Sequence, residues 1–301
     1  MINKDYFRQT RILDGGMGQE LLARGMKSNS TLWSANAILD ENYHQLVLDT
    51  HLDFIKAGAE IIVTTTFATR HKRLKENNLL DKFKYLNQKA GEIAQVAKQK
   101  FPNTYIAGGI PPQHLTYEAD DRDEFEIIEN FNSQAKALNP YIDFFYFDVW
   151  SSIKEVKCGI EAVKEFKKPY LVGLHISEGT TLPSGESIKQ IKDIIDEYTL
   201  GVMLSCVSPE NFENNLLELK SLNIPFGFKL NGFVTTKLEE SYTSVFLGKK
   251  SNPNEILGRR QDLTPTKIQE IAKKFKDAGA TILGGCCETS PSHIKAIAKL
   301  K

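Results

Sequence analysis

Short apolar runs and longer amphipathic segments alternate along this chain. The short runs are rich in β-branched and aromatic residues and end at glycine or polar residues, which is typical of buried strands. The longer segments repeat apolar residues every three to four positions, which is typical of helices that pack one face on a core. The predicted strands are Arg11–Asp14, Glu60–Thr65, Tyr105–Gly109, Asp143–Asp148, Tyr170–His175, Gly201–Cys206, Phe226–Leu230 and Thr281–Gly285. The predicted helices include Glu41–Ala57, Leu79–Lys100, Ser152–Lys167, Ile188–Tyr198, Pro209–Ser221 and Pro265–Ala278.

This alternation predicts that neighbouring strands run parallel. A parallel pair needs a crossover of a dozen or more residues, which is usually a helix. Eight such units in 301 residues predict an α/β protein, a (β/α)8 TIM barrel that spans residues 1–301 as a single domain. A doubly wound open sheet is the alternative. Its phosphate-binding Gly-x-Gly-x-x-Gly turn is missing from the first strand–helix connection, which reads Asp14-Gly15-Gly16-Met17-Gly18.

The overall composition favours a protein that acts on small molecules. Lys and Arg number 38, as do Asp and Glu, so no excess of positive charge predicts binding to nucleic acid or an anionic membrane. The first residues contain no apolar core of a signal peptide, and no run approaches the roughly 18 apolar residues of a spanning helix. Four cysteines are too few for a disulfide framework and fit a reducing compartment. We therefore expect a cytoplasmic protein.

The segment Gly284-Gly285-Cys286-Cys287 carries the most specific chemistry in the sequence. Adjacent cysteines form a disulfide with each other only under strain, whereas two neighbouring thiolates suit a zinc ion. Active sites of barrels lie at the carboxyl ends of the strands, and Cys206 ends another predicted strand. Three thiols would then converge and leave the fourth zinc position for a substrate. The alternative is a redox-active dithiol that binds little metal. Cys158 lies in a predicted helix and is expected to be a packing residue.

Other polar and aromatic residues are predicted near the same end of the barrel. Asp14, Asp148 and His175 each end a predicted strand and can face one cavity. His175 is interpreted as either a ligand or base, or a hydrogen-bonded wall residue. Trp33 and Phe67 would form aromatic walls for a cationic or apolar group, or would pack within loops.

Segments spread along nearly the whole chain resemble the homocysteine S-methyltransferase family. They are Asp14-Gly15-Gly16-Met17-Gly18, Leu32-Trp33-Ser34-Ala35, Thr64-Thr65-Thr66-Phe67, Ser205-Cys206-Val207-Ser208-Pro209 and Gly284-Gly285-Cys286-Cys287-Glu288-Thr289-Ser290-Pro291-Ser292-His293-Ile294. They occur in the family's order from about Arg11 to the C-terminus, and the last of them is a specific signature.

The resemblance implies an enzyme that moves a methyl group to homocysteine and forms methionine. It implies that Cys206, Cys286 and Cys287 hold a catalytic Zn²⁺ and that the substrate thiol takes the fourth position. A metal that binds sulfur lowers the pKa of the thiol, and the thiolate is the nucleophile. The implied methyl donor is S-methylmethionine, S-adenosylmethionine or a betaine-like compound. The Leu32-Trp33-Ser34 segment favours the S-methylmethionine branch.

The resemblance also implies the residues that bind the substrates. The turn at Asp14 and the acidic end of the fourth predicted strand would hold the amino and carboxylate groups of homocysteine. The predicted substrate-binding set is Asp14, Gly15, Gly16, Trp33, Thr66, Phe67, Asp148 and Ser205.

Several residues around this substrate site depart from the family's usual pattern. Asp148-Val149 stands where the family usually has Glu followed by Thr, Ser205 where it has Asn, and Lys229-Leu230-Asn231-Gly232 where it has Tyr-Pro-Asn-Ser. The three predicted zinc ligands are unchanged. These departures leave open the same chemistry on another thiol or selenol acceptor, or a zinc- and thiol-binding protein without turnover.

The stretch 232–260 is the longest without a predicted element, and such long loops are usually functional or mobile. No feature of the sequence predicts an oligomeric state.

Overall fold

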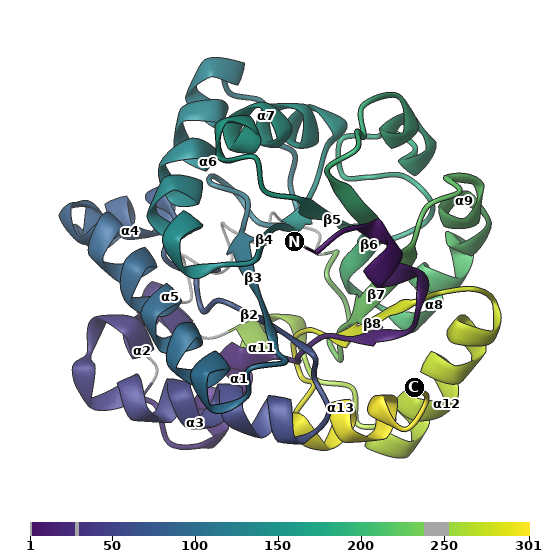
Figure 1. The fold of residues 1–301 in the computed structure, drawn as a ribbon, viewed down its shortest axis with the longest axis horizontal. Coiled ribbons are helices and arrows are strands. Elements are labelled where there is room, and N and C mark those ends of the chain that lie inside the picture. Colours follow the sequence, from purple (N-terminus) through teal and green to yellow (C-terminus); the bar gives the residue numbers. More distant parts are fainter. Residues whose placement is uncertain (1, 28–29, 238–252) are drawn as a thin grey trace.

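The computed structural model describes residues 2–27, 30–237 and 253–301. Eight strands form one sheet in the order β1-β8-β7-β6-β5-β4-β3-β2, and all seven neighbouring pairs are parallel. A further parallel bridge between Leu13 and Ile61 links the two ends of this order, so the sheet curls into a barrel with helices around it (Figure 1). The predicted (β/α)8 barrel is confirmed as a single α/β domain.

Strands and helices alternate as the hydrophobic pattern predicts. The strands are β1 Arg11–Ile12, β2 Ile61–Val63, β3 Tyr105–Ile110, β4 Phe144–Trp150, β5 Tyr170–Leu174, β6 Thr199–Val207, β7 Phe226–Leu230 and β8 Ile282–Gly285. The α-helices are α1 Met17–Ala23, α2 Asn36–Leu39, α3 His44–Lys56, α4 His71–Glu76, α5 Phe83–Lys100, α6 Glu124–Leu138, α7 Ile153–Val163, α8 Pro209–Asn214, α9 Leu216–Ser221, α11 Pro253–Leu257, α12 Pro265–Asp277 and α13 Pro291–Ala298.

Helix starts follow from local sequence. Ser152, Ser208 and Thr264 each precede a helix, and each side chain accepts a hydrogen bond from a backbone N–H of the first turn. Such capping satisfies a donor that the helix itself leaves unpaired. Pro209 and Pro265 then occupy the first turn, where proline's missing N–H has no consequence.

The predicted helix Ile188–Tyr198 is wrong in extent and type. A 3-10 helix covers only Ile188–Asp193, which buries Ile188 and Ile191 at the three-residue spacing of that helix. Beyond it, the Asp196 carboxylate accepts hydrogen bonds from the Tyr198 backbone N–H, at 2.9 Å, and from the Tyr170 hydroxyl, at 2.6 Å. This turn stops the helix before β6. Helix α6 is absent from the predicted helices.

Apolar side chains fill both sides of the strands. On the outer side, Phe228 of β7 packs against Phe212 of α8 and Phe275 of α12, with ring centroids 5.1 and 5.7 Å apart. Inside the barrel, Phe7 from the N-terminal segment packs edge-on against Phe144 at the start of β4. Figure 1 shows the N-terminus over the centre of the barrel. The amino end of the barrel is therefore closed by the chain itself, and a site can open only at the carboxyl ends of the strands.

The stretch 232–260 contains more structure than its sequence predicts. Helix α11 lies within it, and Phe233 pairs with Arg259 in an antiparallel bridge. The rest of that prediction concerns residues 238–252, which lie outside the described part of the chain. Among the described helices, none has both the length and the apolar character needed to cross a bilayer.

Replacing Gly159 in α7 by alanine is expected to destabilise the fold. In an isolated helix this change stabilises by about 0.5–1 kcal/mol. Here the new Cβ would lie 2.0 Å from the ring of Trp150, which is stacked between Phe131 and Phe147. Forcing this packing apart costs about 1–3 kcal/mol, so the free energy of unfolding in urea should fall. Lys157→Ala, on the exposed face of α7, should leave it nearly unchanged. A G159A protein as stable as the parent would contradict this packing argument.

Candidate metal and substrate site

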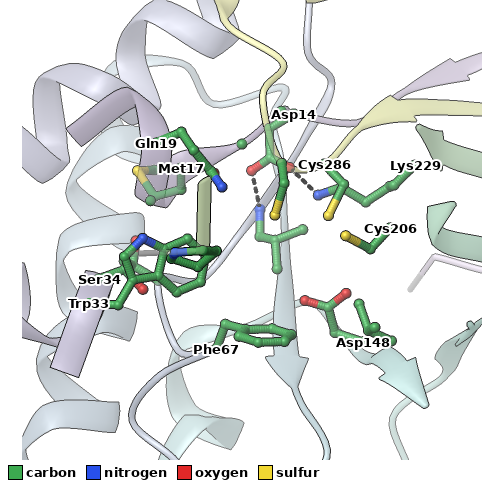
Figure 2. Close-up of a pocket in the computed structure, with 18 of the residues that line it drawn as sticks. Asp14, Met17, Gln19, Trp33, Ser34, Phe67, Asp148, Cys206, Lys229 and Cys286 are labelled. Atoms are coloured by element: carbon green, nitrogen blue, oxygen red, sulfur yellow. Dashed lines mark hydrogen bonds and ion pairs between the residues drawn. The ribbon is translucent and has the colours of Figure 1, made fainter. Parts of the chain in front are cut away.

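Three cysteines from two strands meet at the carboxyl end of the barrel. Cys206 lies in β6, and Cys286 and Cys287 follow β8 directly. Their sulfur atoms all lie within 4.8 Å of one another. Figure 2 shows Cys206 and Cys286 side by side at the pocket. The predicted convergence of the three thiols is confirmed. Cys206 is the last residue but one of β6, however, because the strand continues to Val207.

The backbone at Cys206 is held in an unusual conformation. Its φ angle is +53°, and the pairing of β6 with β7 shifts register between Ser205 and Val207. Asn231, which directly follows β7, supports this bulge: its side-chain amide donates to the Cys206 carbonyl, and its backbone N–H donates to the Val207 carbonyl at 2.9 Å. A left-handed residue other than glycine costs roughly 1–2 kcal/mol and persists where its surroundings hold it. The bulge turns the Cys206 thiol toward the other two.

The glycine pair before the cysteines allows neighbouring side chains to pass. A Cβ at Gly284 would lie 2.8 Å from the Leu13 Cβ and 3.3 Å from the Lys229 Cγ. A Cβ at Gly285 would lie 2.2 Å from the Thr289 hydroxyl oxygen. The end of β8 therefore has to be free of side chains for its neighbours to pack.

The pKa values of the three thiols are shifted in different directions. Burial acts to raise the pKa of Cys206, but hydrogen bonds with Cys286, Cys287 and Tyr117 lower it well below its ordinary value. The pKa values of Cys286 and Cys287 are raised, mainly by their hydrogen bonds to Cys206. The Tyr117 hydroxyl lies 3.1 Å from the Cys206 sulfur. Tyr117 was not predicted as a site residue, since it comes from the loop after β3.

A buried ion pair lies beside the thiols. One oxygen of Asp14 accepts a hydrogen bond from the Lys229 ammonium at 2.8 Å, and the other accepts from the backbone N–H of Val63 at 2.7 Å. The two charged side chains are 2% and 6% exposed, so water hardly screens them. Burial alone would lower the pKa of Lys229, but Asp14, Asp148 and Cys286 raise it. Asp14 is therefore already neutralised by a residue of the protein.

Asp148 lines the opposite side of the same pocket (Figure 2). It lies within β4, two residues before the end of the strand and not at the end as predicted. Burial raises its pKa to about 7, although Lys229 acts to lower it. A carboxylate with this pKa favours a cationic partner.

An aromatic wall completes the pocket. Trp33 and Phe67 both line it and meet edge-on, with ring centroids 6.2 Å apart. Gly18 gives the Trp33 ring its place, because a Cβ there would lie 2.4 Å from the ring. Trp33 itself has a φ of +44°. These rings therefore belong to the pocket and not only to loop packing.

The structure brings most of the predicted residues together and leaves some out. The predicted residues that line the pocket are Asp14, Gly15, Gly16, Trp33, Phe67, Asp148, Cys206, Cys286 and Cys287. Thr66 and Ser205 do not line it: the hydroxyl of Thr66 donates to the Gly109 carbonyl at 2.6 Å, and that of Ser205 bonds the Tyr146 hydroxyl.

His175 and Cys158 serve the fold. Both ring nitrogens of His175 have partners, the Ser205 carbonyl at 3.2 Å and the Ser177 hydroxyl at 2.8 Å. Burial lowers the pKa of His175 to about 4, so the ring is neutral. Of the two interpretations of His175, these contacts support the hydrogen-bonded wall residue and not the ligand or base. The ring also stacks on the ring of Tyr117. Cys158 is buried in α7, away from the three clustered thiols, and burial raises its pKa to about 11.

Lys229 is noted in the sequence only as part of a departure from the family's pattern, and its place in the site was not predicted. The strand Phe226–Leu230 alternates, with Phe228 packed outward against helices, so Lys229 faces the barrel interior. A charged residue at an inward position of an otherwise apolar strand was the available signal. Its partner Asp14 lies 215 residues away in the sequence.

Comparisons with known proteins find relatives over nearly the whole chain. The sequence model of a family described as Homocysteine S-methyltransferase matches residues 11–300. Homocysteine S-methyltransferase 1 of Saccharomyces cerevisiae is 28% identical, over 95% of this chain and 92% of the yeast protein. Homocysteine S-methyltransferase YbgG of Bacillus subtilis is 26% identical, over 95% and 93%. The metallated form of the homocysteine methyltransferase MmuM from Escherichia coli superposes with a TM-score of 0.79 at 18% identity, over 97% and 96%.

Proposed function

The chain belongs to the homocysteine S-methyltransferase family, and from this premise we propose that Cys206, Cys286 and Cys287 hold a zinc ion that activates the thiol of homocysteine. The activity itself is the transfer of a methyl group to homocysteine, which forms methionine. The observation that carries the zinc proposal is the meeting of three thiols on the face of the pocket.

The donor set fits zinc. Zinc binds thiolate sulfur at about 2.3 Å in a tetrahedron, which separates two sulfurs by about 3.8 Å. The three sulfur atoms lie within 4.8 Å of one another, so small side-chain movements would bring them to that spacing. When bound, zinc would act as a Lewis acid and lower the pKa of the substrate thiol, which would be its fourth ligand. The MmuM structure described as metallated has the same fold and supports a metal here.

The charged residues of the pocket support homocysteine as the acceptor. Homocysteine carries an ammonium and a carboxylate close to its thiol. Both oxygens of Asp14 already accept hydrogen bonds, from Lys229 and Val63. We therefore assign the substrate ammonium to Asp148, which faces the pocket and whose raised pKa reflects a carboxylate buried without sufficient positive charge.

The aromatic wall supports a cationic methyl donor. A sulfonium or quaternary ammonium group is attracted to the faces of aromatic rings, and Trp33 and Phe67 stand at the pocket. In the reaction the acceptor sulfur forms a bond to the methyl carbon while the bond from that carbon to the donor's sulfur or nitrogen breaks, and the donor leaves uncharged. Charge is neutralised in this step. The apolar wall of the pocket, which includes Val149 and Phe233, therefore favours it.

The proposal is tested with purified protein, homocysteine and a panel of donors. S-methylmethionine, S-adenosylmethionine and glycine betaine are supplied in turn, and methionine is measured by mass spectrometry. We expect methionine with at least one donor, close to one zinc per chain, and loss of product after chelation. Protein that holds its metal but forms no methionine with any of the three donors would contradict the proposal.

A further inference from the structure

A fully buried lysine inside a barrel wall calls for a physical reason. The ammonium of Lys229 lies inside the barrel, and the side chain is only 6% exposed. Removing an ammonium from water costs several kcal/mol unless a partner compensates. An apolar residue at this inward position would pack without that cost. The lysine therefore serves something that its charge can bind.

The hydrogen bond with Asp14 uses only part of the donor capacity of the Lys229 ammonium. An ammonium has three donor hydrogens, and the hydrogen bond recorded for Lys229 goes to one oxygen of Asp14. Lys229 also lines the pocket that contains the three thiols. Figure 2 shows its nitrogen at Asp14, on the side of the pocket where Cys206 and Cys286 lie. An anion bound in this pocket beside the acceptor sulfur would meet the remaining donors.

We propose that Lys229 binds the carboxylate of the acceptor and so makes the enzyme specific for thiols that carry one. The inference rests on the proposed function, because it concerns how the same pocket holds homocysteine. In that amino acid the carboxylate carbon is four bonds from the sulfur, which keeps the carboxylate close to the thiol site. Lys229 lies opposite Gly284 in the pairing of β7 with β8, and the backbone N–H of Cys286 donates to the Leu230 carbonyl at 2.7 Å, so Lys229 stands near that site.

The arrangement divides the two charges of homocysteine between two residues. Asp14 and Lys229 form a neutral pair that is anchored by the Val63 backbone. Lys229 is then oriented to receive a carboxylate, while Asp148 on the opposite side receives the ammonium. A charge-assisted hydrogen bond of this kind strengthens binding by roughly 10–100-fold. A thiol without a carboxylate would leave the two free donors of Lys229 unpaired, which penalises its binding.

The test compares acceptors that differ by one charged group. Homocysteine carries both groups, 3-aminopropane-1-thiol lacks the carboxylate, and 4-sulfanylbutanoate lacks the ammonium. In K229M we expect kcat/KM to fall at least about tenfold for homocysteine and for 4-sulfanylbutanoate, and by less than about threefold for 3-aminopropane-1-thiol. Calorimetry should show the same pattern for the products, with methionine bound more weakly by K229M and 3-(methylsulfanyl)propan-1-amine unaffected.

A second variant distinguishes two effects of K229M, the loss of a contact with the substrate and the loss of the ion pair with Asp14. K229M leaves the Asp14 carboxylate buried without a positively charged partner, whereas the double variant D14N/K229M removes the negative charge as well. We expect the double variant to keep the loss for homocysteine relative to 3-aminopropane-1-thiol. Equal losses for all three acceptors in K229M, or recovery of the preference for homocysteine in the double variant, would overturn the inference. Failure of the unchanged enzyme to form methionine would instead refute the proposed function.

Discussion

Replacing Cys206 by serine is expected to strip the metal from the protein and to lower methionine formation at least about a hundredfold. Losing even a residue that only orients a metal ligand costs about 10–100-fold in metal affinity or activity. Cys206 is proposed to be a ligand itself, and it supplies the only thiol of the cluster that comes from β6. A serine hydroxyl is a poor substitute, because it does not ionise at neutral pH. Metal content by mass spectrometry and the rate of methionine formation measure the two effects.

Cys158→Ser is the matched control for this variant. It makes the same chemical change in a buried cysteine of α7 that takes no part in the cluster. We expect it to keep its zinc and its activity. The assignment of Cys206 would be wrong if C206S bound zinc as tightly as the unchanged protein and turned over at the same rate.

Replacing Asp148 by asparagine is expected to raise the KM for homocysteine by roughly 10–100-fold, which corresponds to losing a charge-assisted hydrogen bond of about 1.5–3 kcal/mol. Asparagine has nearly the same shape, so the pocket keeps its form. It cannot carry the negative charge that pairs with the substrate ammonium. Steady-state kinetics with saturating donor measures the change, and zinc content should stay at the value of the unchanged protein.

An acceptor without the ammonium supplies the control for this prediction. With 4-sulfanylbutanoate, D148N should perform at least as well as the unchanged enzyme, because no ammonium needs the carboxylate. Asp148→Glu, which keeps the charge, should retain most of the activity with homocysteine. A KM for homocysteine that does not respond to D148N would show that the ammonium binds elsewhere.

Local patterns in the sequence were enough to predict the barrel architecture. Alternating apolar runs and amphipathic segments predict parallel strands and helices, because side-chain periodicity depends on neighbours only a few residues away. The same information failed at Ile188–Tyr198, where contacts of Asp196 with Tyr170 in β5 end the helix. That contact joins segments 26 residues apart, so no local window contains it.

The residues of the three-cysteine cluster could be predicted from the sequence, but the geometry of the cluster could not. The adjacent cysteines and the barrel rule about strand ends together indicate that Cys206, Cys286 and Cys287 meet. The positive φ of Cys206 and its support by Asn231 follow from the pairing of β6 with β7. Thr66 and Ser205 lie next to pocket residues in the sequence, yet their hydroxyl groups bond other parts of the barrel wall.

The sequence by itself therefore determined the barrel, the family and the three thiols, because each depends on residue type and on spacing along the chain. Only the tertiary structure decided how the charges are shared. Lys229 and Asp14 are 215 residues apart, and Tyr117 and Cys206 are 89 apart. Closing the barrel brings each pair within 3.1 Å or less, in an interior with little water to screen a charge. That enclosure occupies both oxygens of Asp14, which is why we assign the substrate's ammonium to Asp148.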